Sequence, residues 1–227
     1  MKYSDIMKID LTSDEILEAV KHARKESFLD NLRERSEFVA LDSKIRGYMG
    51  EIFLRKLFHN VGIEMVKTNA LQSWGGDSDF EIKTHNSGNL IVECKTSLIP
   101  DSMSTLKNVI SKCDIKILKR ESDFTEIPID IHIQIYFNAL RRQRDSKLSQ
   151  IIGQVKDYSD EQIIEKLGLR ELEGFFVAWI DKEELNKYMN LIDEADRVWH
   201  FSLRDFWKCP LTWANAPKDF IEYLNKK

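Results

Sequence analysis

The pattern of hydrophobic and polar positions predicts two helices at the start of the chain. Apolar residues recur at nearly helical spacing after a capping box of Thr12 and Glu15, which predicts a first helix over residues 12–40. A second helix is predicted from Ser43 to Val61, and Gly62 is a natural stop for it. Its apolar side consists of Ile45, Met49, Ile52, Phe53 and Leu57.

The pattern then changes to that of strands. Residues 63–69 predict a short strand, and residues 79–82 and 89–97 predict two more, joined by the turn sequence THNSG. Pro100 ends the last of these. Residues 129–138 alternate almost perfectly, with isoleucine at every second position from 129 to 135, which predicts a strand with one apolar and one polar face.

The remaining elements complete an α/β pattern. A helix is predicted from Ser102 to about Arg120, and a second helical stretch is predicted to follow the basic loop 141–147 and to reach about residue 172. GFFVAWI at 174–180 predicts the last clear strand. The last 40 residues are rich in aromatic side chains and are expected to be irregular. This order of helices and strands predicts an α/β fold with a mixed central β-sheet flanked by α-helices.

Three segments are distinguished along the chain. Residues 1–42 are expected to form an N-terminal helical appendage, residues 43–182 a core, and residues 183–227 a C-terminal aromatic-rich appendage, all within one compact domain. The chain has no apolar run of the length that a membrane span needs and no apolar leader at its start, so a cytoplasmic protein with no membrane partner is expected.

Charge and cysteine content exclude some classes. The net charge of −4 offers no support for a general nucleic-acid coat protein, although a local basic surface would still serve a specific site. Three scattered cysteines predict neither a disulfide framework nor a zinc site, and the histidines have no metal-ligand spacing.

Charged residues fall at the centre of the predicted sheet, where burial is costly. Glu93 and Lys95 lie two residues apart on one strand and therefore share a face, and Asp79 lies on the strand before it. If these strands pair, Asp79 comes close to Glu93, and two carboxylates repel unless a cation such as Mg²⁺ lies between them. Asp77, in the preceding glycine-containing loop, is the alternative first acid. Lys95 is then placed to orient a metal-bound water or to neutralise charge on a phosphate.

These residues resemble the signature of the PD-(D/E)xK nuclease superfamily, which has a restriction-endonuclease-like fold. SDF at 78–80 supplies the first acid, Asp79, and VECKTS at 92–97 supplies the Glu-x-Lys of Glu93 and Lys95. GYMGE at 47–51 supplies the helical glutamate, Glu51. A second Glu-x-Lys, at residues 81–83, runs straight into a turn and is interpreted as a decoy.

The resemblance implies a Mg²⁺-dependent DNA endonuclease in which Mn²⁺ can replace Mg²⁺. Asp79, Glu93 and the main-chain carbonyl of Cys94 would bind the metal, Glu51 would assist, and Lys95 would prepare the attacking water. It also implies double-stranded DNA as substrate, a 5′-phosphate product and, for cutting both strands, a homodimer. A type II restriction-like enzyme is the main interpretation. A structure-specific repair nuclease, a catalytically silent binding module of the same fold and an RNA substrate remain as alternatives.

Weaker features are consistent with a nucleic-acid partner. The basic residues predicted on one side of the 102–120 helix, and those of the segment 141–147, are candidate phosphate contacts, with a plain solvated surface as the alternative: Lys112, Lys116, Lys119, Arg120, Arg141, Arg142 and Arg144. On the polar face of the 129–138 strand, Gln134 is preferred to His132 and Tyr136 as an auxiliary site residue. Trp199, Trp207 and Trp213 are expected to cap a core or fill a dimer interface in preference to stacking on bases.

Overall fold

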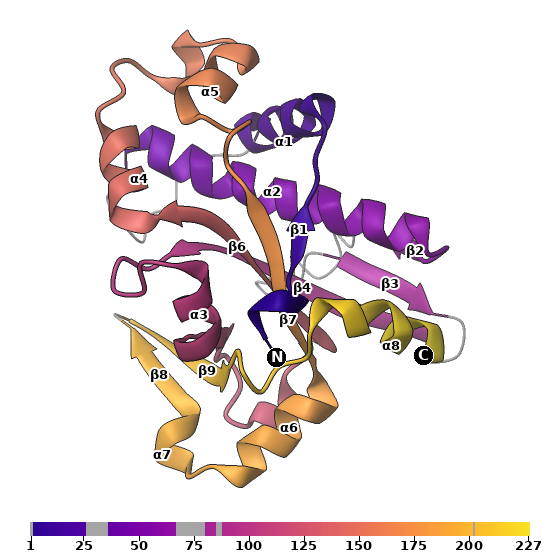
Figure 1. Cartoon of the computed structure of the whole chain (residues 1–227). Coiled ribbons are helices and arrows are strands. Elements are labelled where there is room, and N and C mark those ends of the chain that lie inside the picture. The colour runs from indigo at the N-terminus through magenta and orange to yellow at the C-terminus, as the bar shows by residue number, and fades with distance from the viewer. Residues whose placement is uncertain (1, 26–35, 67–79, 85–87, 202) are drawn as a thin grey trace.

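A six-stranded mixed sheet forms the centre of the computed structural model, which describes residues 2–25, 36–66, 80–84, 88–201 and 203–227 (Figure 1). The strand order is β1-β7-β6-β4-β3-β2, and only β4 and β6 run parallel; the other neighbours are antiparallel. The bounds are β1 (Met7–Ile9), β2 (Glu64–Val66), β3 (Phe80–Thr84), β4 (Gly88–Ile99), β6 (Ile131–Leu140) and β7 (Gly174–Asp181). The predicted α/β fold with a mixed sheet flanked by helices is confirmed at this level.

Helices cover one face of this sheet. The first core lies between that face and α1 (Ser13–Lys25), α2 (Glu37–Asn60), α5 (Asp160–Leu167) and α8 (Phe220–Lys226). The capping box predicted for α1 is present, because the Thr12 amide donates to Glu15 and the Glu15 amide donates to the Thr12 hydroxyl. Phe220 of α8 packs against Phe58 of α2 and Phe176 of β7, and Ile9 of β1 belongs to the same core.

The boundary between the first two helices differs from the prediction. Residues 37–40 belong to α2, whose N-cap is Ser36 with its hydroxyl accepting from the Val39 amide. A first helix reaching residue 40 is therefore wrong, and residues 26–35 lie outside the described part of the chain. The serine side chain satisfies an amide that the start of a helix leaves without a partner, which favours a new start at this point.

The other face of the sheet is covered by a second layer. It contains α3 (Leu106–Lys112), α6 (Lys182–Leu191), α7 (Glu194–Arg197) and a three-stranded antiparallel sheet in the order β5-β9-β8, with bounds β5 (Asp114–Leu118), β8 (Val198–Phe201) and β9 (Arg204–Pro210). Figure 1 shows this small sheet beside α3 and α7, away from α1 and α2.

Four predictions after residue 100 are wrong, two of them for helices and two for segments expected to be irregular. The predicted helix over 102–120 ends at Lys112, and residues 114–118 form β5, whose Ile115 and Ile117 are buried. The C-terminal region predicted as irregular contains β8, β9 and α8. The basic segment predicted as a loop is the helix α4 (Arg141–Ser149), and the helical stretch expected to reach residue 172 ends at Leu167. The β5–β9 pairing joins residues far apart in sequence, so no local pattern announces it.

The predicted hairpin and the alternating strand are confirmed, with one difference. β3 pairs with β4 in an antiparallel register, and β4 ends at Ile99, before Pro100. On β6 the isoleucines face the first core, but the face expected to be polar is buried too, with His132 at 1% and Gln134 at 4% exposure. The second layer buries these polar side chains, and buried polar groups need hydrogen-bond partners.

In the described part of the chain, no helix is both long and apolar enough to cross a membrane.

Candidate active site

Glu93 and Lys95 lie on the central strand β4, on the face that is covered by the second layer. The parallel register of β4 and β6 places His132 beside Glu93 and Gln134 beside Lys95. Alternation along β4 puts Val92, Cys94 and Thr96 on the opposite face, toward α2. The two residues of the Glu-x-Lys pair are therefore neighbours on one face, as the sequence predicts.

The Glu93 carboxylate is almost fully buried and is held by two nitrogen atoms. Lys95 Nζ lies 2.8 Å from Oε1, and His132 Nδ1 lies 2.7 Å from Oε2. Burial alone would raise the pKa of Glu93, but the charge of Lys95 and the hydrogen bond from His132 outweigh it and hold the pKa at about 2. Glu93 is therefore an anion at neutral pH, in a fixed orientation.

The sequence prediction preferred Gln134 to His132 as the auxiliary residue, but His132 is the one that contacts the Glu93 carboxylate. An ionised carboxylate only accepts hydrogen bonds, so Nδ1 of His132 carries the proton that it shares with Glu93. Its other ring nitrogen, Nε2, is buried and has no hydrogen-bond partner among the residues that the structure describes. This contact depends on the parallel pairing of residues 93 and 132, which alternation within one strand does not reveal.

Gln134, the preferred auxiliary residue, contacts main chain and a hydroxyl. Its Nε2 lies 3.0 Å from the Lys95 carbonyl oxygen, 3.0 Å from the Ile135 carbonyl oxygen and 3.3 Å from Ser97 Oγ. These contacts tie β6 to the strand that carries Glu93 and Lys95. Gln134 therefore supports the backbone at Lys95.

Lys95 is the member of the site that reaches solvent. Its side chain is 34% exposed, whereas the Glu93 side chain is 4% exposed. A reactant from solvent would therefore meet the Lys95 ammonium before it meets the carboxylate.

The predicted first acids fall outside the described residues. Asp79 and Asp77 both lie in the segment 67–79, so the structure does not place them. Asp79 directly precedes Phe80, and Phe80 pairs with Val92, which directly precedes Glu93. Within the described residues, no group of three or more histidine, cysteine, aspartate and glutamate side chains is placed to hold a metal ion.

The structure places the helix of Glu51 on the other face of β4. A Cβ atom on Gly50, the residue before it, would lie 2.9 Å from Thr96 Cγ2 and 3.3 Å from Cys94 Sγ, and both of these side chains point away from Glu93. Glu51 itself is half-buried. Its proposed role at a metal, like that of the Cys94 carbonyl, stays a prediction.

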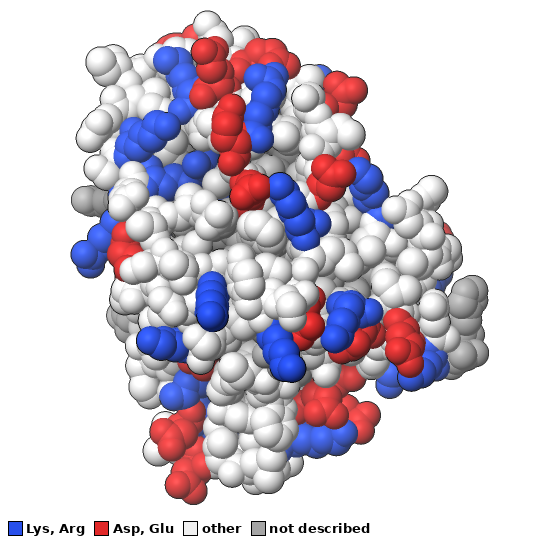
Figure 2. Space-filling view, viewed as in Figure 1, with Lys and Arg blue, Asp and Glu red and all other residues white. Residues whose placement is uncertain are grey.

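The candidate DNA contacts come from several elements. Lys112 lies at the end of α3 and Lys116 on β5, while Lys119 and Arg120 follow β5, so they do not share a helix. Arg144 is a correction: its guanidinium binds buried Asp42, with Nη2 2.6 Å from Oδ1, and also binds the Leu167 carbonyl, so it is a structural residue. Arg141 and Arg142 stay candidates on the first turn of α4. Figure 2 shows basic and acidic side chains interspersed over the face in view.

Comparison with known protein families, with curated proteins and with solved structures finds no match to this chain. The case for a function therefore depends on the residues and contacts described above.

Proposed function

We propose that this chain is a metal-dependent DNA endonuclease, of a type II restriction-like kind, whose active site is built on Glu93 and Lys95. The observation that supports this most is the ionised, buried Glu93 carboxylate with the Lys95 ammonium 2.8 Å away at its solvent side. Packing alone does not require such a pair at the centre of a sheet, since buried ion pairs are at best weakly stabilising. In a site that hydrolyses a phosphodiester, a carboxylate can bind the metal and an ammonium group can stabilise the charge that develops on the phosphate.

The donor set suits Mg²⁺, with Mn²⁺ as a replacement. An ionised carboxylate and a main-chain carbonyl are hard oxygen donors of the kind that Mg²⁺ prefers. Glu93, the Cys94 carbonyl and Asp79 would hold the ion, and Glu51 is proposed to assist. When bound, the ion would supply Lewis acidity toward a phosphoryl oxygen and toward water.

The chain's own residues would then do two things. His132 and Lys95 hold Glu93 in one orientation and in its charged form, which fixes the position of the donor oxygens. The Lys95 ammonium, at the solvent side, would orient the attacking water and neutralise charge that develops on the phosphate. Attack of the water oxygen on phosphorus, with departure of the 3′ oxygen, leaves a 5′-phosphate. One site per chain would call for a homodimer to cut both strands of a duplex.

One observation favours a second candidate, a catalytically silent binding module of the same fold. Both carboxylate oxygens of Glu93 already have nitrogen partners, so the ion pair is complete without a metal. In a silent module, this closed network would be purely structural. In an active enzyme, metal binding would compete with Lys95 for Oε1.

The test is incubation of the purified chain with supercoiled plasmid DNA and Mg²⁺, in parallel with a chelator control. We expect discrete linear fragments that are lost when the metal is chelated, because the carboxylate site needs a cation to act on a phosphate. Nicked circles alone would shift the proposal to a repair or nicking enzyme. Intact plasmid, single strands, branched DNA and RNA after incubation with either Mg²⁺ or Mn²⁺ would contradict the proposal and favour the silent module.

A further inference from the structure

The two parallel strands of the central sheet end near one another, and the chain leaves them toward opposite layers. β4 ends at Ile99 and leads into α3 of the second layer, whereas β6 ends at Leu140 and leads into α4. α4 packs on α2, and its Leu148 belongs to the first core (Figure 1). In open α/β sheets, ligands bind in the crevice outside the carboxyl ends of strands whose connections diverge in this way. This end of the sheet is therefore a position where a ligand is expected.

A hollow of about 390 Å³ lies at this end of the sheet, and we call it the strand-end hollow. Its apolar lining residues are Ile99, Ala139 and Leu140, and its polar lining residues are Ser104, Asn138, Gln143, Arg144 and Lys147. Within the described part of the chain, no acidic side chain lines it. Each polar lining residue carries a hydrogen-bond donor, and two of them are cations. Such a lining favours an anion.

Arg144 brings an excess of positive charge to the strand-end hollow. Arg144 and Arg46 share one carboxylate, because Nη2 of Arg144 lies 2.6 Å and Nε of Arg46 lies 2.9 Å from the two oxygens of Asp42. The two arginine side chains are 11% and 7% exposed. Among the residues that the structure describes, no second carboxylate pairs with either of them. A buried charge is costly unless it is paired, so an anion beside Arg144 would be stabilised.

Lys147 and Gln143 add two exposed donors from α4. They lie one turn apart and therefore share a side of the helix. In the described part of the chain, neither side chain has a hydrogen bond or an ion pair. Asp101, the acid of the loop that follows β4, accepts from the Arg142 amide at 3.1 Å. The Lys147 ammonium is therefore available to an anion from solvent.

Ser104 lines the hollow in an uncommon backbone conformation. Its φ of 62° is the one positive value for a residue other than glycine in the described part of the chain. The left-handed region is unfavourable for a residue with a Cβ atom, and residues held there cluster at functional sites. The Ser104 hydroxyl donates to the Asp101 carbonyl at 3.4 Å, which is long for a hydroxyl donor. A ligand oxygen in the hollow could replace that acceptor.

We propose that the strand-end hollow binds a phosphate group. The phosphate oxygens accept from Lys147, Gln143 and Ser104, and the phosphate charge balances the excess positive charge at Arg144. The apolar lining residues contact the sugar or base that carries the phosphate. Hydrogen bonds between a cation and a phosphate are stronger than those between neutral groups, so Lys147 makes the main contact.

The phosphate has two possible sources, a free nucleotide and the backbone of DNA. Ile99 lies four residues after Lys95 on β4 and on the same face, which is about 13 Å along the strand. A duplex rises about 3.4 Å per base pair, so a backbone phosphate a few nucleotides from the cleaved bond could reach the hollow. The DNA source rests on the proposed function, whereas the phosphate site itself does not.

The test is titration calorimetry of the full chain in a buffer that contains a chelator, so that failure of the nuclease proposal leaves the measurement intact. AMP is the probe for a free nucleotide, adenosine is the same molecule without its phosphate, and a short DNA duplex supplies backbone phosphates. Lys147→Ala should weaken binding by about tenfold, the effect of one lost hydrogen bond to a charged group. Gln143→Ala should have a smaller effect, because its amide is neutral.

The two sources give different results. For a free nucleotide, we expect AMP to bind at least about tenfold more tightly than adenosine and to lose that advantage in Lys147→Ala. For the DNA backbone, we expect Lys147→Ala to weaken only the duplex and to reduce the dependence of log affinity on log salt concentration by about 0.9. Either result supports a phosphate site at Lys147.

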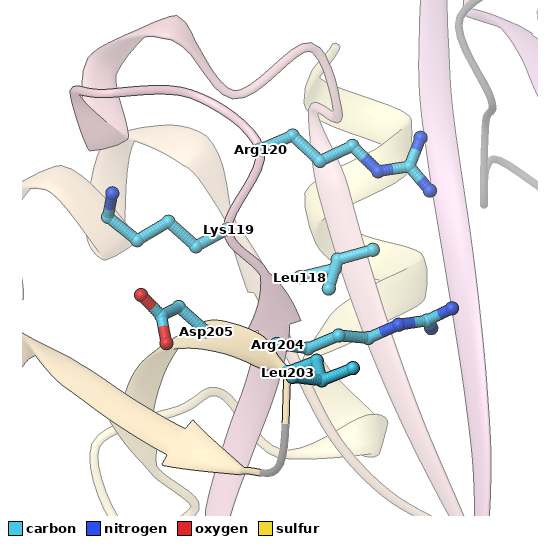
Figure 3. Close-up of a pocket in the computed structure, with 6 residues that line it drawn as sticks. All are labelled: Leu118, Lys119, Arg120, Leu203, Arg204 and Asp205. Carbon is cyan, nitrogen blue, oxygen red and sulfur yellow. The ribbon is translucent and has the colours of Figure 1, made fainter. Parts of the chain in front are cut away.

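Arg204→Ala is the matched control, because it removes an exposed cation from a different hollow. That hollow has a volume of about 420 Å³ and lies on the small sheet, and its lining includes an acid, Asp205. Figure 3 shows the side chain of Arg204 pointing to one side, while Lys119 and Asp205 point to the other. Arg204→Ala should bind AMP and the duplex as the parent does.

Four results would overturn the proposal. They are no binding of AMP or of the duplex, binding of adenosine as tight as that of AMP, unchanged binding by Lys147→Ala, and equal losses in Lys147→Ala and Arg204→Ala. The last result would indicate a general effect of positive charge. Urea denaturation checks that Lys147→Ala is as stable as the parent, as expected for an exposed side chain.

Discussion

Glu93→Gln is expected to abolish metal-dependent cleavage and to weaken binding of Mn²⁺, measured by titration calorimetry. The amide keeps the shape of the side chain but has no charge to offer a cation, and it replaces one accepting oxygen with a donor that faces Lys95 or His132. Loss of one preorganised electrostatic group in an active site costs on the order of a thousandfold in rate. We expect at least that loss here, because the proposed metal would lose its buried carboxylate.

The matched control is Glu81→Gln, which changes the glutamate of the other Glu-x-Lys sequence. Glu81 lies on the neighbouring strand β3 and pairs with Ile91 of β4. Cleavage and metal binding should be unchanged by this substitution. Equal losses in both variants would show that the sheet, and not the Glu93 carboxylate, was affected.

Glu93→Gln should also change how the unfolding free energy depends on pH. The pKa of Glu93 falls from an ordinary 4.5 to about 2 on folding, so the folded state favours the charged form. The ionised Glu93 therefore contributes to the free energy of unfolding above about pH 4.5, and this contribution is lost as the pH falls toward about 2. The difference in unfolding free energy between the parent and Glu93→Gln should narrow across that interval. A difference that does not depend on pH would contradict an ionised Glu93.

Asp42→Ala is expected to have the largest effect on stability. Asp42 is buried at 1% exposure, and it accepts from Arg46 of its own helix and from Arg144 of α4. Removing it leaves two nearly buried guanidinium groups without their anion, which costs about 3–5 kcal/mol in the free energy of unfolding. Urea denaturation followed by circular dichroism measures this loss.

Asp145→Ala is the control for that prediction. Asp145 also pairs with an arginine, Arg141, but at 3.9 Å and with both side chains substantially exposed, so its loss should cost about 0–1 kcal/mol. Similar losses in both variants would contradict the structural role of Asp42.

The stability lost in Asp42→Ala should also depend on pH. Burial alone would raise the pKa of Asp42, but the two arginines lower it overall. The difference in unfolding free energy between the parent and Asp42→Ala should therefore narrow as the pH falls below the ordinary carboxyl pKa of 3.8.

The periodic parts of the fold were predictable, because a strand or helix that buries one face carries that face in its sequence. The alternation of residues 129–138 gave β6, and the turn sequence before Gly88 gave the β3–β4 hairpin. The small sheet was not predictable in this way. The five residues of β5 follow a helix directly, and their partners on β9 are about 90 residues away, so the pairing depends on tertiary contacts.

The candidate site was likewise predictable only where local spacing determines the contact. Glu93 and Lys95 were identified from their spacing on one strand, and their ion pair follows from that spacing. His132 was passed over in favour of Gln134, because the two side chains share one face of β6 and only the register with β4 distinguishes them. Arg144 was interpreted as a candidate phosphate contact in a basic loop, because its partner Asp42 lies about 100 residues earlier in the chain and no local pattern reveals that ion pair.

The central claim, hydrolysis at the Glu93–Lys95 pair, is tested most directly by plasmid cleavage with Lys95→Ala beside Lys83→Ala. Lys83 is the lysine of the other Glu-x-Lys sequence, and its ammonium binds Glu64 on the surface, 2.9 Å away. We predict that Lys95→Ala loses cleavage in Mg²⁺ while Lys83→Ala cuts as the parent does. Cleavage by Lys95→Ala at the parental rate would contradict the proposed site.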